Sequence, residues 1–266
     1  MAAPLPRQDR ADALARLRRH LVDNGTAPEG RRRGPADGGD IPVHPLLRPL
    51  VPGGVLPRGT IVAALPRTGV TASGGAALSY TTLALIAGAT AGGAWAGVIG
   101  FPNLGIAAVS GLGADLSKML LLDEPGDRWP DATAVLANAV DLVLLHAPRR
   151  PNATQLRQIT SRVRPTDRQR GCVLIVTSPW ESAHLAVTAR DPQWEGLGDG
   201  TGNLGGRRVT IAVTGRATHG QRREAELWLP AADGTISEYV PETEQQPQHE
   251  QPEQPQRPRL PRLRIA

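Results

Sequence analysis

The chain has 266 residues, of which 40% are hydrophobic, 21% are charged and only 3% are aromatic. This length allows one large domain or two small ones, and it excludes a miniature scaffold that depends on disulfide staples. Thirty basic and 25 acidic residues give a formal charge of +5, which permits contact with nucleic acid or with an acidic partner. Lys118 is the single lysine, so almost all of the positive charge comes from arginine.

The sequence favours a cytoplasmic protein that does not span a membrane. Cys172 is the single cysteine and lies in an apolar run, so a disulfide framework is excluded and a buried, unreactive thiol is expected. The first residues lack the apolar segment of a secretory signal. The uncharged stretch at 68–114 is interrupted by Gly, Ser, Thr, Asn and Pro, which favours buried elements of a globular domain over a membrane span.

The N-terminal part is expected to be tethered to the main domain rather than integral to it. Residues 1–24 contain a helical pattern in which Ala13, Leu14, Leu17 and Leu21 form a stripe opposite several arginines. This predicts a basic amphipathic helix that either packs on the domain or docks on a partner. Residues 25–40 are rich in Gly, Pro and charge without an apolar period, which predicts a flexible linker.

Residues 41–240 alternate short aliphatic runs with segments of helical character, and this region is expected to form the core domain. The expected strands are 60–65, 95–100, 119–122, 141–145, 172–177, 185–188, 208–214 and 226–229, and the expected helices are 81–91, 104–116, 129–139 and 154–163. The alternation predicts an α/β fold with a mostly parallel sheet that helices cover on both faces. Helices are no longer predicted after Val187, which indicates an antiparallel extension at one edge of the sheet.

The C-terminal segment 241–266 has low complexity, with an acidic half rich in Gln, Glu and Pro and a basic end. Such a segment cannot bury enough apolar area to offset its ordering entropy, so we expect it to be disordered on its own. It is either a solvated tail without function or a short linear motif that folds on a partner. The partner-binding residues of that motif would be Arg257, Arg259, Leu260, Arg262, Leu263 and Ile265.

The segment at 60–85, with its lead-in at 52–59, resembles the phosphate loop and first helix of the RecA-like recombinase core. A Walker A loop, G-x-x-x-x-G-K-[ST], wraps phosphates with backbone N–H groups, neutralises their charge with lysine and holds Mg²⁺ with the hydroxyl. If Gly74 is the first glycine, other residue types occupy the second-glycine and lysine positions, and only the hydroxyl position is matched. The loop is therefore predicted to be a vestigial nucleotide site, made of Gly74, Gly75, Ser79, Tyr80 and Thr81.

Two more positions of the RecA-like pattern are unmatched. Pro102 lies near the place where the resemblance implies a glutamate that activates water. The run at 140–146 is similar to a Walker B strand, but His146 stands where the resemblance implies the Mg²⁺-coordinating aspartate, and a neutral imidazole is a poor ligand for Mg²⁺. We expect no productive ATP hydrolysis and no cofactor. The alternative is an unrelated α/β domain that never had a nucleotide site.

The segment at 149–170 is strongly basic, with seven arginines against the single acid Asp167. Arg149, Arg150, Arg157, Arg162 and Arg164 could contact DNA or the acidic face of a partner protein. A solvated helix face is the alternative interpretation. The segment has no aromatic residue, which disfavours binding of single strands by base stacking. The six histidines of the chain lack the spacing of metal ligands, so we expect no metal site.

The degenerate RecA-like core, the basic N-terminal helix and the tail together resemble the ImuA-type translesion-synthesis accessory proteins of bacteria, actinobacterial ones in particular. The resemblance covers about 41–240 and is carried by the segments 126–130, 194–198, 207–216 and 225–230. It implies a RecA-like fold of the P-loop NTPase type and a non-catalytic adaptor of the SOS response. The implied partners are a Y-family polymerase homologue and, through it, an error-prone replicative-type polymerase, with self-association also open. The alternatives are a divergent DNA-dependent ATPase and a cell-division inhibitor linked to DNA damage.

Overall fold

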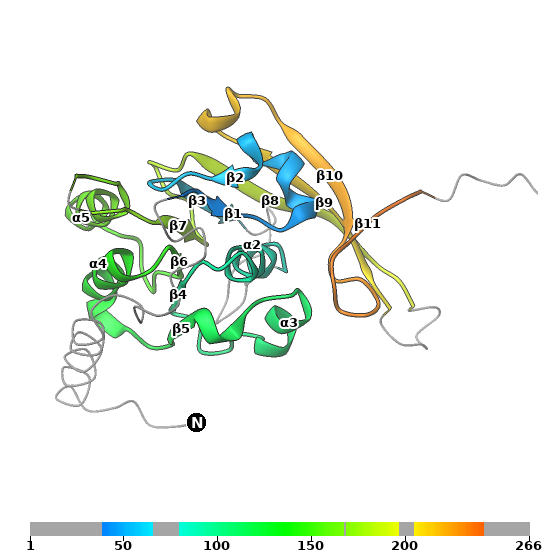
Figure 1. Cartoon of the computed structure of the whole chain (residues 1–266), viewed down its shortest axis with the longest axis horizontal. Helices are drawn as coiled ribbons and strands as arrows, with labels where there is room; N and C mark the ends of the chain where they lie inside the picture. The colour runs from blue at the N-terminus through cyan, green and yellow to red at the C-terminus, as the bar shows by residue number, and fades with distance from the viewer. Residues whose placement is uncertain (1–38, 66–79, 168, 197–204, 242–266) are drawn as a thin grey trace, which may run out of the picture.

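The computed structural model describes residues 39–65, 80–167, 169–196 and 205–241 (Figure 1). The predicted N-terminal helix, all of the linker before Gly39, and the predicted tail motif lie outside these ranges. The same holds for Gly74, Gly75 and Ser79 of the predicted phosphate loop. Within the described ranges, no helix is long and apolar enough to cross a membrane.

The core of the fold is a nine-stranded mixed sheet with the strand order β11-β10-β9-β8-β3-β7-β6-β4-β5. The strands are β3 (Ile61–Leu65), β4 (Ala96–Ile99), β5 (Met119–Leu122), β6 (Leu142–Leu145), β7 (Val173–Val176), β8 (Leu185–Trp194), β9 (Arg207–Thr214), β10 (Arg223–Trp228) and β11 (Ser237–Glu238). All neighbours from β8 to β5 pair in parallel, whereas β8 to β11 pair antiparallel. The predicted parallel sheet with an antiparallel extension at one edge is therefore confirmed.

In the described ranges, the connecting segments are four α-helices and several short elements. The helices are α2 (Tyr80–Ala91), α3 (Ile106–Gly111), α4 (Trp129–Ala139) and α5 (Ala153–Val163), and the 3₁₀ turns are η1 (Pro45–Leu50), η2 (Pro52–Gly54), η3 (Leu116–Lys118), η4 (Gly126–Arg128) and η5 (Arg216–Thr218). Strands β1 (Ile41–Pro42) and β2 (Val55–Leu56) form a separate antiparallel pair. The helix predicted at 104–116 is wrong in extent, because the chain leaves the helix at Gly111 and turns at Gly113, where φ is +87°.

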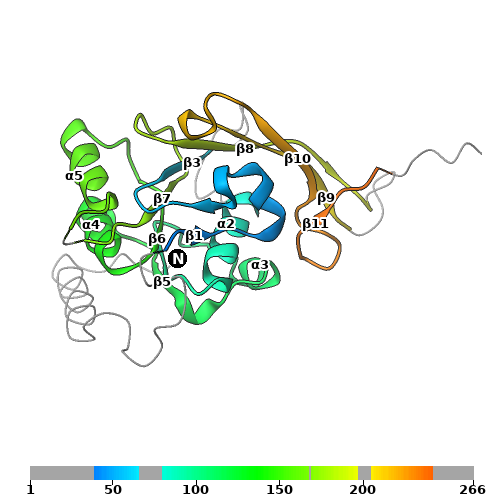
Figure 2. The same cartoon turned by 45° about the horizontal axis from the view of Figure 1, so that its top comes forward.

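The two faces of the sheet are covered differently. Helix α2 and the β1–β2 segment pack on one face, in an apolar cluster that includes Leu47, Ile86 and Ile211. Helices α4 and α5 pack on the other face, in a cluster that includes Trp129 and Ile159. Strands β8, β9 and β10 contribute to the first cluster only, so the expectation of helices on both faces holds for the parallel part of the sheet and not for its extension. Figure 2 shows α4 and α5 at one end of the molecule and the extension at the other.

Candidate functional site

The carboxyl ends of the parallel strands meet at one edge of the sheet. Gly100, His146 and Thr177 directly follow β4, β6 and β7, and these strands are neighbours in the sheet or one strand apart. The central strand β3 ends at Leu65, and α2 begins at Tyr80. In open α/β sheets, ligands bind in the crevice at this edge, at the switch point where the strand order reverses. In this sheet the switch point is at β3, which lies between β7 and β8.

His146 fills the place after β6 with a closely packed imidazole. Its Nδ1 lies 2.8 Å from the hydroxyl oxygen of Thr177, which is a hydrogen bond, and its ring centroid lies 5.4 Å from that of Phe101. The backbone of His146 also lies close to that of Gly100, because a Cβ atom on Gly100 would lie 2.3 Å from the carbonyl oxygen of His146. Among the residues that the structure describes, no three His, Cys, Asp or Glu side chains gather in a group that could hold a metal ion.

The first turn of α2 holds the two described residues of the predicted phosphate loop, Tyr80 and Thr81. Thr81 is 2% exposed, and its hydroxyl has no hydrogen-bond partner in the described part of the chain. The guanidinium of Arg207, at the start of β9, lies 5.4 Å from the centroid of the Tyr80 ring and 5.7 Å from that of Trp194. The Arg207 cation of β9 therefore lies beside Tyr80, which occupies the lysine position of the Walker A pattern.

One hydrogen bond to another described residue holds the guanidinium of Arg207 in this place. Its Nε donates to the carbonyl oxygen of Leu229 at 2.8 Å, while its Nη2 is buried and has no partner among the described residues. Burial lowers the pKa of Arg207, and the neighbouring Tyr80 acts in the opposite direction. Local sequence patterns do not place Arg207 at this site, because only the pairing of β9 with the extended end of β8 brings it to α2.

Comparison with known proteins places the chain in a family. Residues 49–182 match the family model described as MT3502 N-terminal domain. "Uncharacterized protein Rv3395c" of Mycobacterium tuberculosis is 31% identical in an alignment of 216 positions that covers 77% of this chain and 93% of the relative. The chain belongs to the MT3502 N-terminal domain family. The part that matches the MT3502 N-terminal domain includes Thr81, His146 and α5, whereas Arg207 lies beyond it.

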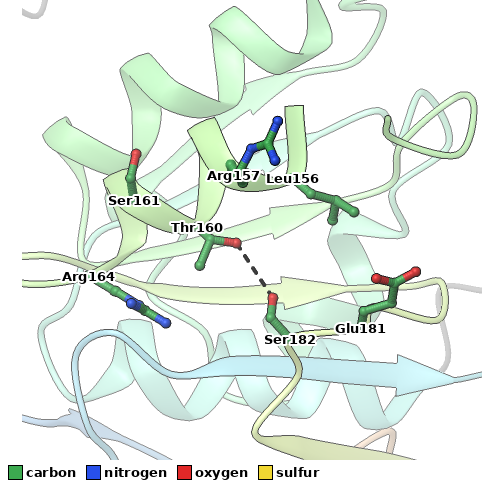
Figure 3. Close-up of a pocket in the computed structure, with 7 residues that line it drawn as sticks. All are labelled: Leu156, Arg157, Thr160, Ser161, Arg164, Glu181 and Ser182. Atoms are coloured by element: carbon green, nitrogen blue, oxygen red, sulfur yellow. Dashed lines mark hydrogen bonds between the residues drawn. The ribbon is translucent and has the colours of Figure 1, made fainter. Parts of the chain in front are cut away.

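The arginines predicted to contact DNA or a partner lie before, in and directly after α5, within the part that matches the MT3502 N-terminal domain. Arg149 pairs with Asp127, and Arg150 pairs with Glu181 at 3.4 Å, all with exposed side chains. Arg157, Arg162 and Arg164 are exposed and have no ion-pair partner among the described residues. The structure brings Arg157 and Arg164 together with Glu181 and Ser182 around one pocket (Figure 3), and Arg162 does not line it.

Two further titratable side chains of the domain have structural roles. The Cys172 thiol is fully buried, as predicted, and this burial raises its pKa to about 12, which disfavours the reactive thiolate. The Nδ1 of His184 accepts a hydrogen bond from the backbone N–H of Ile61 at 3.0 Å. Burial lowers the pKa of His184, and the charges of Arg216 and Arg164 lower it further, so the neutral imidazole that can accept this bond is favoured.

Proposed function

We propose that the protein is a non-catalytic RecA-like adaptor of DNA-damage tolerance. It acts in translesion synthesis by associating with a Y-family polymerase homologue and, through it, with an error-prone replicative-type polymerase. The sheet order supports the RecA-like assignment, because the strand that leads to the predicted phosphate loop, β3, is central and lies at the switch point. The helix α2 that follows the loop begins at the same edge.

The observation that carries the non-catalytic part of the proposal is the packing of His146. Phosphoryl transfer depends on a cation that neutralises the phosphates and on oxygen ligands that hold Mg²⁺ beside them. At the carboxyl end of β6, an imidazole hydrogen-bonded to Thr177 and packed against Phe101 takes the place where such a ligand would stand. This arrangement supports a scaffold in which the inherited crevice has become part of the packed structure.

The partner contact is tested by substitution in the C-terminal motif. In co-purification of the full chain with the polymerase homologue, Leu260→Ala, Leu263→Ala and Ile265→Ala together should lower binding about tenfold or more, because apolar anchors carry most of the energy of a short motif. The matched control changes Gln245, Gln246 and Gln251 to alanine in the acidic half of the same tail and should leave binding unchanged. Equal binding by both triple variants would contradict the role of the motif.

A divergent DNA-dependent ATPase is the second candidate, favoured by the Arg207 cation beside Tyr80 and by the unpartnered hydroxyl of Thr81. Calorimetric titration of the full chain with ATP and Mg²⁺ separates the two functions. The adaptor should show a Kd no tighter than about 1 mM, whereas the ATPase should bind at micromolar Kd. In the latter case Thr81→Val, which removes a hydroxyl that has no partner in the described structure, should weaken binding while leaving the fold intact.

A further inference from the structure

A pocket of about 330 Å³ lies between α5 and the segment that follows β7 (Figure 3). Leu156, Arg157, Thr160 and Arg164 line it from the side of α5, and Glu181 and Ser182 line it from the other side. The two sides are joined at one point by a long hydrogen bond of 3.5 Å between the hydroxyl groups of Thr160 and Ser182. The volume is at the lower end of that of ligand pockets, so it suits one or two side chains rather than a large cofactor.

The pocket carries uncompensated positive charge. The guanidinium groups of Arg157 and Arg164 have no ion-pair or hydrogen-bond partner among the described residues. The single acid of the lining, Glu181, is already paired with Arg150 at the rim. Arg216 adds a fourth guanidinium nearby, because its Nη2 donates to the carbonyl oxygen of Ser182 at 2.8 Å. A carboxylate entering the pocket would therefore meet two guanidinium groups that are free to form charge-assisted hydrogen bonds.

We propose that this pocket binds an acidic segment of a protein partner that also carries an apolar side chain. The carboxylates would contact Arg157 and Arg164, and the apolar side chain would pack against Leu156. This inference goes beyond the proposed function, because it requires neither the C-terminal motif nor a polymerase. It assigns a second binding surface to the part of the chain that matches the MT3502 N-terminal domain.

The lining favours a peptide over nucleic acid. Glu181 stands on the wall opposite the arginines, where it would repel a continuous phosphodiester backbone, whereas a peptide can place its few acids away from it (Figure 3). No aromatic side chain is among the lining residues, so bases would find no stacking surface there. The acidic half of the chain's own tail is not the occupant that we expect, because it follows β11, which lies at the opposite end of the molecule from α5 (Figure 1).

The helix sets the spacing of the acids. Arg157 lies in α5 and Arg164 directly follows the last residue of this helix, so their separation of seven residues corresponds to about 10 Å along the helix axis. Three residues of an extended chain span about the same length. The expected ligand therefore carries two acidic residues three positions apart, with an apolar residue between them.

The test is fluorescence anisotropy with the full chain and a labelled synthetic peptide that contains Glu-Leu-Ala-Glu between neutral Ser and Gly residues. The control peptide contains Gln-Leu-Ala-Gln. We expect the acidic peptide to bind at least about tenfold more tightly, and the double variant Arg157→Gln/Arg164→Gln to remove this preference. The matched double variant Arg149→Gln/Arg162→Gln, with the same change of charge outside the lining, should keep it. Ser161→Trp, at an exposed position of the lining, should block the pocket and abolish binding.

Three results would overturn the inference. Equal binding of the acidic and neutral peptides would show that the pocket does not select carboxylates. Equal weakening by the two double variants would show that only the overall charge of the surface matters. Tighter binding of a labelled single-stranded oligonucleotide, lost in Arg157→Gln/Arg164→Gln, would assign the surface to nucleic acid. All substituted residues are exposed, so unchanged thermal unfolding midpoints are expected and would exclude misfolding as the cause of any loss.

Discussion

Replacing Arg58 by methionine is expected to lower the free energy of unfolding by about 3–5 kcal/mol. One guanidinium nitrogen of Arg58 lies 2.5 Å from a carboxylate oxygen of Asp141, and the two side chains are only 7% and 12% exposed. Methionine keeps most of the apolar stem but leaves the Asp141 carboxylate buried without its cation. Removing one partner of a buried ion pair is costly for this reason, even where the intact pair adds little net stability.

The pair also joins the amino ends of the parallel strands, at the edge opposite the candidate site. Arg58 Nη1 donates to the carbonyl oxygen of Gly171 at 2.9 Å, and its Nε donates to that of Gly39 at 3.1 Å. The second carboxylate oxygen of Asp141 accepts a hydrogen bond from the backbone N–H of Trp95 at 2.9 Å. The segments that lead into β3, β4, β6 and β7 therefore meet at this one pair, and loss of Arg58 also leaves the carbonyl group of the buried Gly171 without this hydrogen bond.

Urea denaturation of the full chain measures the effect. The matched control is Arg149→Met, which breaks the pair with Asp127, whose side chains are 61% and 86% exposed and whose loss should cost less than about 1 kcal/mol. Arg58→Met combined with Asp141→Leu should recover part of the stability, because no charge then remains buried. A cost for Arg58→Met no larger than that for Arg149→Met would contradict the role of the pair.

The sequence was sufficient to predict the parallel strands β3 to β7 and the place of His146, but not the short strands β1, β2 and β11, the full length of β8 or the contacts between distant segments. Aliphatic runs bounded by Gly, Pro and polar residues mark β3, β4, β6 and β7, and the residue that ends such a run must lie at the carboxyl edge of a parallel sheet. The Arg58–Asp141 pair joins residues 83 positions apart, and the contact of Arg207 with Tyr80 depends on the antiparallel pairing of β9 with β8. Neither of these two contacts can be predicted from local sequence patterns.

The pocket at α5 also has one wall that the sequence predicts and one that it does not. The basic segment can be predicted from the sequence, and so can the spacing of Arg157 in the helix and Arg164 directly after it, because positions seven residues apart lie on the same side of a helix. The opposite wall cannot, since Glu181 and Ser182 reach α5 only through the position of β7 in the sheet. The basic pattern of the helix is compatible with a binding surface and with a solvated helix face alike. The shape of the pocket and the acid on its far wall come from the tertiary structure.

Gly100→Ala is expected to destabilise the fold by about 3 kcal/mol, from two separate effects. Gly100 has φ of +84°, a conformation that costs a residue with a Cβ atom roughly 1–2 kcal/mol. The new Cβ would also lie 2.3 Å from the carbonyl oxygen of His146, so the backbone must move. That movement is opposed by the sheet, because the N–H of His146 donates to the carbonyl oxygen of Ile99 and the N–H of Gly100 to that of Leu122, both at 2.9 Å.

Gly113→Ala separates these two effects. Gly113 has nearly the same φ, +87°, but no atom lies within 4 Å of the place where its Cβ would be, so only the conformational cost of about 1–2 kcal/mol applies. Urea denaturation of both variants gives the cost of the close approach as the difference between them. The NMR signals of the His146 ring should shift in Gly100→Ala alone, because displacement of the 146 backbone alters the hydrogen bond to Thr177. Equal unfolding free energies of the two variants would mean that β4 and β6 can separate freely at this edge. The packing around His146 would then not support a non-catalytic crevice.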